Sequence, residues 1–340
     1  MHESERSSTA LIAPLPLKLT ALRATRPGTL GDVIPAPELS VLAQRAVRQT
    51  SEAMATVGAS VLKRLEAPEA GSPRADDLAW LDSQESGGEE LKSIAAYGTT
   101  DVAGLLLSAY EHVQGLELVL FGEDMLPIPA LSLARAAQEA CILFCYTIDT
   151  DVPTAMRLAR VAALRIHAAQ ENVRTLELFG DAATPEMTQN AADGWNGFRG
   201  YFERAGLELT LDGRGKYVTA VTCEGHKAPL SPKTTDLSKL YIPAAHNAWT
   251  IGSGATHSRT WLTQGLAGPW GPTTAGIVFP LLDVADALAA AMGRYVGEDT
   301  ERSRRAIHTR RIGLMRGLGH TGATVSWSDY VQRHEQPAAD

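Results

Sequence analysis

The chain has 340 residues, of which 44% are hydrophobic and 21% are charged, as in soluble globular proteins. Its formal net charge of −8 argues against a protein that coats nucleic acid over its whole surface. Three cysteines without a Cys-x-x-Cys pair argue against a disulfide framework and a structural zinc site. The polar N-terminus and the absence of 18 uninterrupted apolar residues favour a cytoplasmic protein that does not span a membrane.

The N-terminal third predicts an arm followed by helices. Residues 1–37 contain five prolines and no sustained periodicity, which indicates a flexible arm. From Pro37 to about residue 67 the apolar residues recur at helical spacing, and a short helix is expected at 76–81. Thr99 or Thr100 is the expected N-cap of the next helix, which would end near residue 122.

Two further helices are expected to start at prolines, at 129 and 153. The short connection between them predicts that they pack against each other as an antiparallel hairpin. Another helix is predicted from Thr184-Pro185-Glu186 to Gly206, which has the residue type of a helix stop.

Residues 207–222 alternate between apolar and polar side chains around Asp212-Gly213, which predicts one small inserted β-hairpin. Helices then resume at about 236–265, 275–299 and 300–320, and residues 331–340 are expected to be a disordered tail. The predicted fold is therefore all-α, a multi-helix bundle in a domain of residues 38–330 with one β-hairpin insertion.

The segment WTIGSGATHSRTWL, at 249–262, is rich in small residues. A phosphate-binding loop would follow a strand and carry a lysine in the Walker form, and neither feature is present here. We therefore expect a helix whose small residues, Gly252 and Ala255, let a neighbouring helix approach. The same helix would place Ser253 and His257 one turn apart.

Arg135 and Glu139 are also one turn apart, at the start of a helix that becomes strongly apolar. A charge in such a helix requires a partner or a ligand, so this pair is either a structural ion pair or part of a binding site. His257 has the same two interpretations: a general acid and base, or a ring packed between helices.

These motifs, over residues 100–265, resemble those of HEPN-like helical bundles from bacteria. The residues that carry the resemblance are Arg135, Glu139, Tyr146, Asp149, Ser253 and His257. The resemblance implies a mostly helical protein, often a homodimer, in a group that includes metal-independent ribonucleases and non-catalytic nucleotide-binding modules.

The expected function is therefore the binding or cleavage of RNA or nucleotides, in stress or phage defence. His257 would be the general acid and base, Arg135 would neutralise phosphate, and Glu139 would orient the arginine or the substrate. From 302 to 327 there are six arginines and no acidic residue, which suits phosphate. The expected substrate-binding residues are Ser253, Arg302, Arg304, Arg305 and His308.

Two other functions remain open from the sequence. The chain could be a non-catalytic helical dimerisation or adaptor protein, or a helical bundle with a small-molecule pocket between its helices. No cofactor is expected. No metal site is expected either, because the histidines lack partners at metal-ligand spacing.

Overall fold

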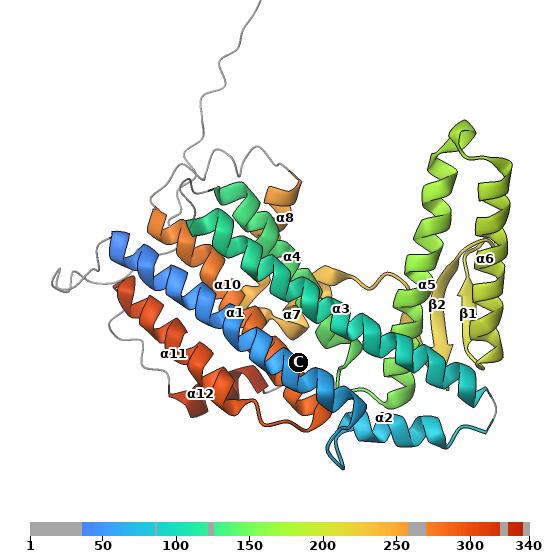
Figure 1. Ribbon diagram of the computed structural model, residues 1–340, viewed down its shortest axis with the longest axis horizontal. Coiled ribbons are helices and arrows are strands. Elements are labelled where there is room, and N and C mark those ends of the chain that lie inside the picture. The colour runs from blue at the N-terminus through green and yellow to red at the C-terminus, as the bar shows by residue number, and fades with distance from the viewer. Residues whose placement is uncertain (1–35, 86, 122–125, 258–269, 320–325, 336–340) are drawn as a thin grey trace, which may run out of the picture. The chain divides into compact units, whose positions relative to one another are not determined.

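The computed structural model describes residues 36–85, 87–121, 126–257, 270–319 and 326–335. Over these residues the chain is helical apart from one small antiparallel sheet, so the predicted all-α fold with a small β insertion is confirmed (Figure 1). Most of the predicted arm, 1–35, lies outside the described residues. The helices are α1 (Ala36–Glu66), α2 (Pro73–Asp82), α3 (Gly88–Phe121), α4 (Pro127–Thr147), α5 (Thr154–Leu178), α6 (Pro185–Arg204), α7 (Thr234–Tyr241), α8 (His246–Thr256), α10 (Trp270–Val296), α11 (Glu301–Gly317) and α12 (Trp327–Glu335).

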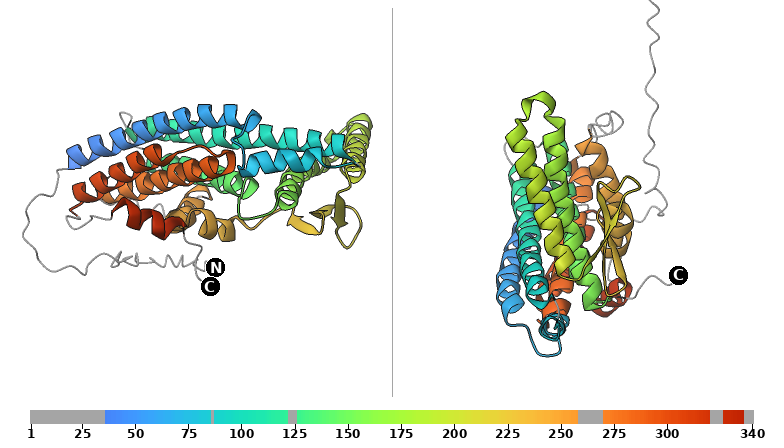
Figure 2. Two further views of the ribbon diagram at one scale, coloured as in Figure 1. Left: turned by 90° about the horizontal axis from the view of Figure 1, so that it is seen from below. Right: turned by 90° about the vertical axis from the view of Figure 1, so that its right-hand side faces the viewer.

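The larger of two hydrophobic cores lies between α1, α3, α4, α8, α10 and α11. Figure 2 shows α1 beside α3, with α10 and α11 beneath α1. Phe144 and Leu282 are fully buried in this core, where α4 packs on α10. The helix α4 and the 276–296 part of α10 are apolar and long enough to cross a membrane. However, 56% and 72% of the apolar 18-residue stretches in these two helices are buried inside the protein.

The smaller core lies between α2, the start of α3, α5, the end of α6 and the sheet. The sheet has three antiparallel strands in the order β1 (Glu208–Leu211), β2 (Val218–Cys223) and β3 (His226–Pro229). The buried amide of Gln170, on α5, holds β2 by accepting from the backbone N–H of Val218 and donating to its carbonyl. The predicted hairpin is therefore a β1–β2 pair that is anchored on α5.

The third strand was missed by the sequence analysis, which placed a loop there. It pairs with β2 through a two-residue turn, Glu224 and Gly225, in which both residues have positive φ, 47° and 80°. Such turns favour Asn-Gly or Asp-Gly, and the glutamate hid the signal.

One long helix connects the two cores. The first turns of α3 contribute Leu91 and Ile94 to the smaller core, and from Val102 onward the helix belongs to the larger one. The predicted start at Thr99 or Thr100 is therefore wrong. Both hydroxyls donate to the carbonyl four residues earlier, within the helix, and α3 begins at Gly88.

The predicted α4–α5 hairpin is also wrong. The buried residues of α4 lie in the larger core and those of α5 lie in the smaller one, so each helix packs mainly on other partners. Likewise, the helix predicted over 236–265 is interrupted between Tyr241 and His246. Pro243 lacks an amide hydrogen and disfavours the helical conformation of the residue before it, so α7 ends and α8 begins anew.

Two of the predicted segments are described only in part. Helix α12 extends to Glu335 and so includes the beginning of the segment 331–340 that the sequence predicted to be a tail. Residues 258–265 of the predicted helix lie outside the described residues.

Candidate functional site

Helices α4 and α8 pack closely at Gly252. A methyl group added there would lie 2.9 Å from the Cβ atom of Arg135 and 3.3 Å from the carbonyl oxygen of Leu131. The small residue thus permits close helix packing, as the sequence predicted, and the segment through residue 256 is helical. This contact brings Arg135 to the helix that carries Ser253.

The guanidinium of Arg135 lies over the indole ring of Trp249, with its central carbon 3.6 Å from the ring centroid. Only 12% of the Arg135 side chain is exposed. Burial lowers the pKa of this guanidinium, and the charge of Glu139 opposes that shift. The Glu139 carboxylate lies 3.6 Å from Nη2, beyond hydrogen-bond distance, and is 45% exposed. Arg135 is therefore oriented mainly by the aromatic ring and only loosely neutralised.

Two N–H groups at this contact lack acceptors. Among the described residues, Nη1 of Arg135 and Nε1 of Trp249 are buried without a hydrogen-bond partner, and the same holds for the acceptor Oε1 of Gln138. A buried polar group without a partner costs about 1–3 kcal/mol. A ligand with acceptor oxygens would satisfy the two donors, so this contact is the first candidate site.

Ser253 and His257 lie further along α8. His257 is the C-cap residue, is exposed, and donates its backbone N–H to the carbonyl oxygen of Ser253 at 3.1 Å. It follows Gly252 by five residues, or about 7.5 Å along a helix. Within the described part of the chain, no hydrogen bond or ion pair links its ring to Arg135 or Glu139. The structure therefore brings Arg135 and Glu139 to α8 and leaves His257 at the exposed end of that helix.

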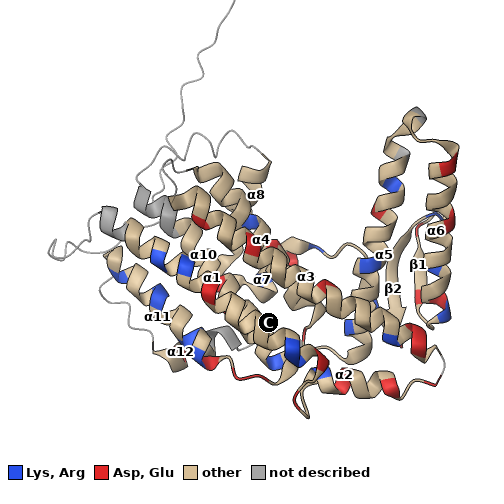
Figure 3. Cartoon of the chain, in the orientation of Figure 1, with Lys and Arg blue, Asp and Glu red and all other residues tan. Residues whose placement is uncertain are grey.

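The four predicted binding residues of α11 are divided between surface and interior. Figure 3 shows basic residues along this helix. Arg302 is exposed, and Arg305 is exposed and paired with Glu301. Arg304 is buried and donates to Asp286 at 3.1 Å. His308 is also buried, with its ring packed on two aromatic rings of α12, Trp327 and Tyr330. Only Arg302 and Arg305 of these four present their side chains to solvent.

The residues at the exit of α4 contact a buried arginine of α5. Oδ2 of Asp149 accepts from Nη1 of Arg160 at 3.0 Å and from the Tyr241 hydroxyl at 2.8 Å. The Arg160 guanidinium also lies 4.2 Å from the ring centroid of Tyr146 and donates to its carbonyl oxygen. Tyr146 and Asp149, which contributed to the family resemblance, are thus part of the packing between α4, α5 and α7.

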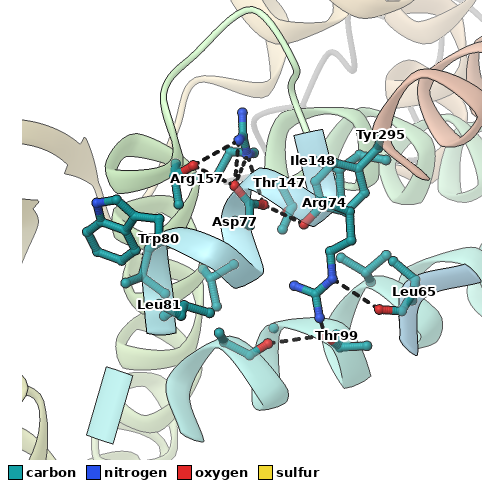
Figure 4. Close-up of a pocket in the computed structure, with 16 residues that line it drawn as sticks. Leu65, Arg74, Asp77, Trp80, Leu81, Thr99, Thr147, Ile148, Arg157 and Tyr295 are labelled. Atoms are coloured by element: carbon teal, nitrogen blue, oxygen red, sulfur yellow. Dashed lines mark hydrogen bonds and ion pairs between the residues drawn. The ribbon is translucent and has the colours of Figure 1, made fainter. Parts of the chain in front are cut away.

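A second candidate site, which the sequence analysis missed, is a pocket where the two cores meet (Figure 4). Its apolar walls include Leu65 and Val102 of the larger core and Leu81 and Leu158 of the smaller one. The cavity measures about 40 Å³. This volume is the space open to the centre of a water molecule, of which one water needs about 10–15 Å³. The cavity therefore has room for about three waters.

The carboxylate of Asp77, on α2, accepts hydrogen bonds from three side chains that line this pocket. It accepts Nε of Arg157 at 3.1 Å and Nη2 at 2.5 Å, the Thr154 hydroxyl at 2.7 Å and the Tyr295 hydroxyl at 2.8 Å. Nη1 of Arg157 donates to the carbonyl oxygens of Asp149 and Val152. Burial raises the pKa of Tyr295, and the charge of Asp77 adds to that shift. Tyr295 therefore remains a neutral donor.

A second arginine of α2 lines the same pocket. Arg74 is 9% exposed and donates Nε to the Leu65 carbonyl oxygen at 3.1 Å and Nη2 to the Thr99 hydroxyl at 3.2 Å. In Figure 4 its guanidinium is directed toward these two neutral acceptors, on another side of the pocket from Arg157. The pocket thus contains two guanidinium groups and one carboxylate.

Comparison with known proteins does not assign a role to either site. Searches against family models, curated proteins and solved structures find no match for this chain. Within the described residues, no group of three or more His, Cys, Asp or Glu side chains is arranged to hold a metal ion.

Proposed function

We propose that this protein binds RNA or a nucleotide through a phosphate group at the contact between α4 and α8, as a HEPN-like helical protein. The observation that carries the proposal is the buried Nη1 of Arg135, which has no acceptor among the described residues while the ring of Trp249 holds the guanidinium in place. A phosphate group offers several acceptor oxygens to a guanidinium, often two at once.

The neighbouring carboxylate supports a ligand site over a purely structural ion pair. Glu139 is 3.6 Å from Nη2 and about half exposed, so it balances the charge of Arg135 without occupying its donors. An incoming phosphate would compete with a weak partner only, since exposed pairs of this kind contribute about 0–1 kcal/mol.

RNA cleavage is the catalytic form of the proposal. The 2′-hydroxyl of the RNA would attack the adjacent phosphorus and displace the 5′-oxygen of the next nucleotide. His257 would take the proton of the hydroxyl and return it to the leaving oxygen, because neutral imidazole both accepts and donates near neutral pH. Its position at the exposed end of α8 leaves the ring accessible to a strand whose phosphate is bound at Arg135. Ser253, between the two on α8, would contact the same strand, with Arg302 and Arg305 as exposed cations of α11. No metal takes part in this scheme.

Fluorescence anisotropy with labelled single-stranded RNA and with nucleotides tests the binding. We expect Arg135→Ala to weaken binding about ten- to a hundredfold, the loss of one charged hydrogen-bond partner. Glu139→Gln should strengthen it about two- to fivefold, because it removes a nearby negative charge. Arg199 and Glu203 on α6 form an exposed pair with the same spacing, so Arg199→Ala and Glu203→Gln are matched controls that should change nothing.

The same experiment separates the proposal from an adaptor role. If wild-type protein does not bind, or if Arg135→Ala and Glu139→Gln weaken binding equally, the phosphate site is excluded. Cleavage is tested with RNA in EDTA: His257→Ala should abolish it and leave binding intact. RNA that stays whole with wild-type protein excludes the catalytic form alone.

A further inference from the structure

The pocket between the two cores contains a buried arginine that has no carboxylate partner in the described part of the chain. Its charged groups are Arg74, Arg157 and Asp77, each at most 9% exposed. Asp77 forms its ion pair with Arg157, at 2.5 Å. Among the described residues Arg74 is bonded only to neutral acceptors, the Leu65 carbonyl and the Thr99 hydroxyl. The pocket therefore carries one uncompensated positive charge, and buried charges are normally paired.

Three hydroxyls and the second guanidinium of the pocket have partners of their own. The hydroxyls of Thr154 and Tyr295 donate to Asp77, and that of Thr147 donates to the carbonyl oxygen of Leu143. Arg157 is fixed by carbonyl oxygens of the α4–α5 connection as well as by Asp77. Arg74 differs from them. A guanidinium has five N–H donors, and the hydrogen bonds of Arg74 use two of its three nitrogens.

We propose that this pocket binds a small oxyanion, the carboxylate or phosphate group of a metabolite, with Arg74 as the residue that contacts it. The cavity of about 40 Å³ has the size of about three waters, which suits one such group. Trp80, Ala95 and Val161 also line the pocket and are partly exposed to solvent. The bound anion would neutralise Arg74 and accept its free N–H groups.

Binding here would connect the two cores. Arg74 lies on α2 and forms hydrogen bonds with Leu65, at the C-terminal end of α1, and with Thr99, on α3. Tyr295, on α10, lines the same pocket. An anion that binds where the two cores meet in the native state only would stabilise that state by RT ln(1 + [L]/Kd), so the melting temperature would rise with the anion concentration. This site is separate from the α4–α8 contact, so the two proposals stand or fall independently.

Thermal shift and isothermal titration with inorganic phosphate and with acetate, each against chloride at equal ionic strength, test the proposal. We expect at least one of the two to raise Tm as its concentration rises and to give a saturable heat of titration, and the tighter one identifies the group that binds. Arg74→Gln should weaken that binding at least about tenfold, and Arg135→Ala should leave it unchanged. A wild-type protein that responds to neither anion overturns the proposal, as does a response that Arg135→Ala abolishes.

Two further measurements apply if Arg74→Gln does not fold. Arg74→Lys keeps the buried positive charge and loses the planar fork, so it should fold and still bind the anion about tenfold more weakly. Crystals of wild-type protein soaked in selenate should show an anomalous peak within hydrogen-bond distance of Arg74. Unchanged affinity in Arg74→Lys, or selenate only at other places, overturns the proposal.

Discussion

Removing the Asp77 carboxylate should destabilise the protein more than removing any surface carboxylate. Asp77→Ala leaves the Arg157 guanidinium, whose side chain is 7% exposed, without a counterion. It also leaves the hydroxyls of Thr154 and Tyr295 without their acceptor. Breaking a buried ion pair in this way costs about 3–5 kcal/mol. That is a large share of the roughly 5–15 kcal/mol by which a domain is stable.

The chain contains a matched control for this effect. Glu171 pairs with Arg174 at 2.5 Å, the same distance as between Asp77 and Arg157. The side chains of Arg174 and Glu171 are 41% and 47% exposed, whereas those of Arg157 and Asp77 are 7% and 8% exposed. Because water already solvates such a pair, Glu171→Ala should cost about 0–0.5 kcal/mol. The distance between the charges is the same in the two pairs, so the difference in cost measures burial together with the two hydroxyl bonds of Asp77.

Urea denaturation followed by circular dichroism measures both effects. A double-mutant cycle adds Arg157→Met, which keeps most of the stem volume of the arginine. The double variant should be more stable than the sum of the single effects predicts, by about 1–3 kcal/mol, because neither charge is then left alone. Equal costs for Asp77→Ala and Glu171→Ala, or strictly additive single effects, would refute this reasoning about the junction.

Two further predictions concern packing and pH. Gly252→Val should destabilise the α4–α8 contact by about 1–3 kcal/mol in the same urea assay, because a Cβ there meets that of Arg135 at 2.9 Å. Gly194→Val on the open part of α6 should change stability by less than about 1 kcal/mol, in the stabilising direction, because valine has the higher helix propensity. Alkaline pH should also lower stability: burial raises the pKa of the Cys223 thiol from 9.0 to about 12, and burial likewise raises the pKa of Tyr241, Tyr295 and Tyr330. These groups ionise first in the unfolded chain. Their contribution to folding stability is therefore complete below pH 9 and is lost as pH rises from 9 toward 12. Urea midpoints at pH 7, 9 and 10.5 would show the loss, and a constant midpoint contradicts it.

Local signals in the sequence predicted the helix ends well where the end depends on one residue. Thr184 caps α6 by accepting the backbone N–H of Met187, and Gly206 ends it with a positive φ of 79°. Both features follow from residue type alone.

The start of α3 could not be predicted in this way. The pair at 87–88 and Gly98 resemble helix breakers, yet the helix continues through Gly98. A Cβ at that position would meet the side chain of Val161 at 2.7 Å, so the glycine provides space for α5. The glycine is therefore explained by a contact between segments more than 60 residues apart, which spacing along the chain does not reveal.

The same distinction, between local signals and contacts of distant segments, applies to the candidate sites. The sequence predicted site residues on the helix of Arg135 and on α8, and the structure brings these two helices together at Gly252. The position of His257 depends on where α8 ends, which the sequence placed beyond residue 257. The junction pocket was missed because Arg74, Asp77 and Arg157 look like ordinary helix-surface charges until α2, α3, α5 and α10 are packed together.

The partners of the buried arginines distinguish structural residues from candidate binding residues. Four arginines are each paired with a buried or nearly buried aspartate and are thus already neutralised: Arg157 with Asp77, Arg160 with Asp149, Arg304 with Asp286 and Arg311 with Asp283. Arg135 and Arg74 differ, because one has a half-exposed glutamate at 3.6 Å and the other only neutral acceptors. Desolvating a guanidinium costs several kcal/mol unless a negative group compensates it. An anion from solution is the simplest compensation for these two, which is why both proposed sites are anion sites, whereas Arg304 and Arg311 of α11 already have aspartate partners.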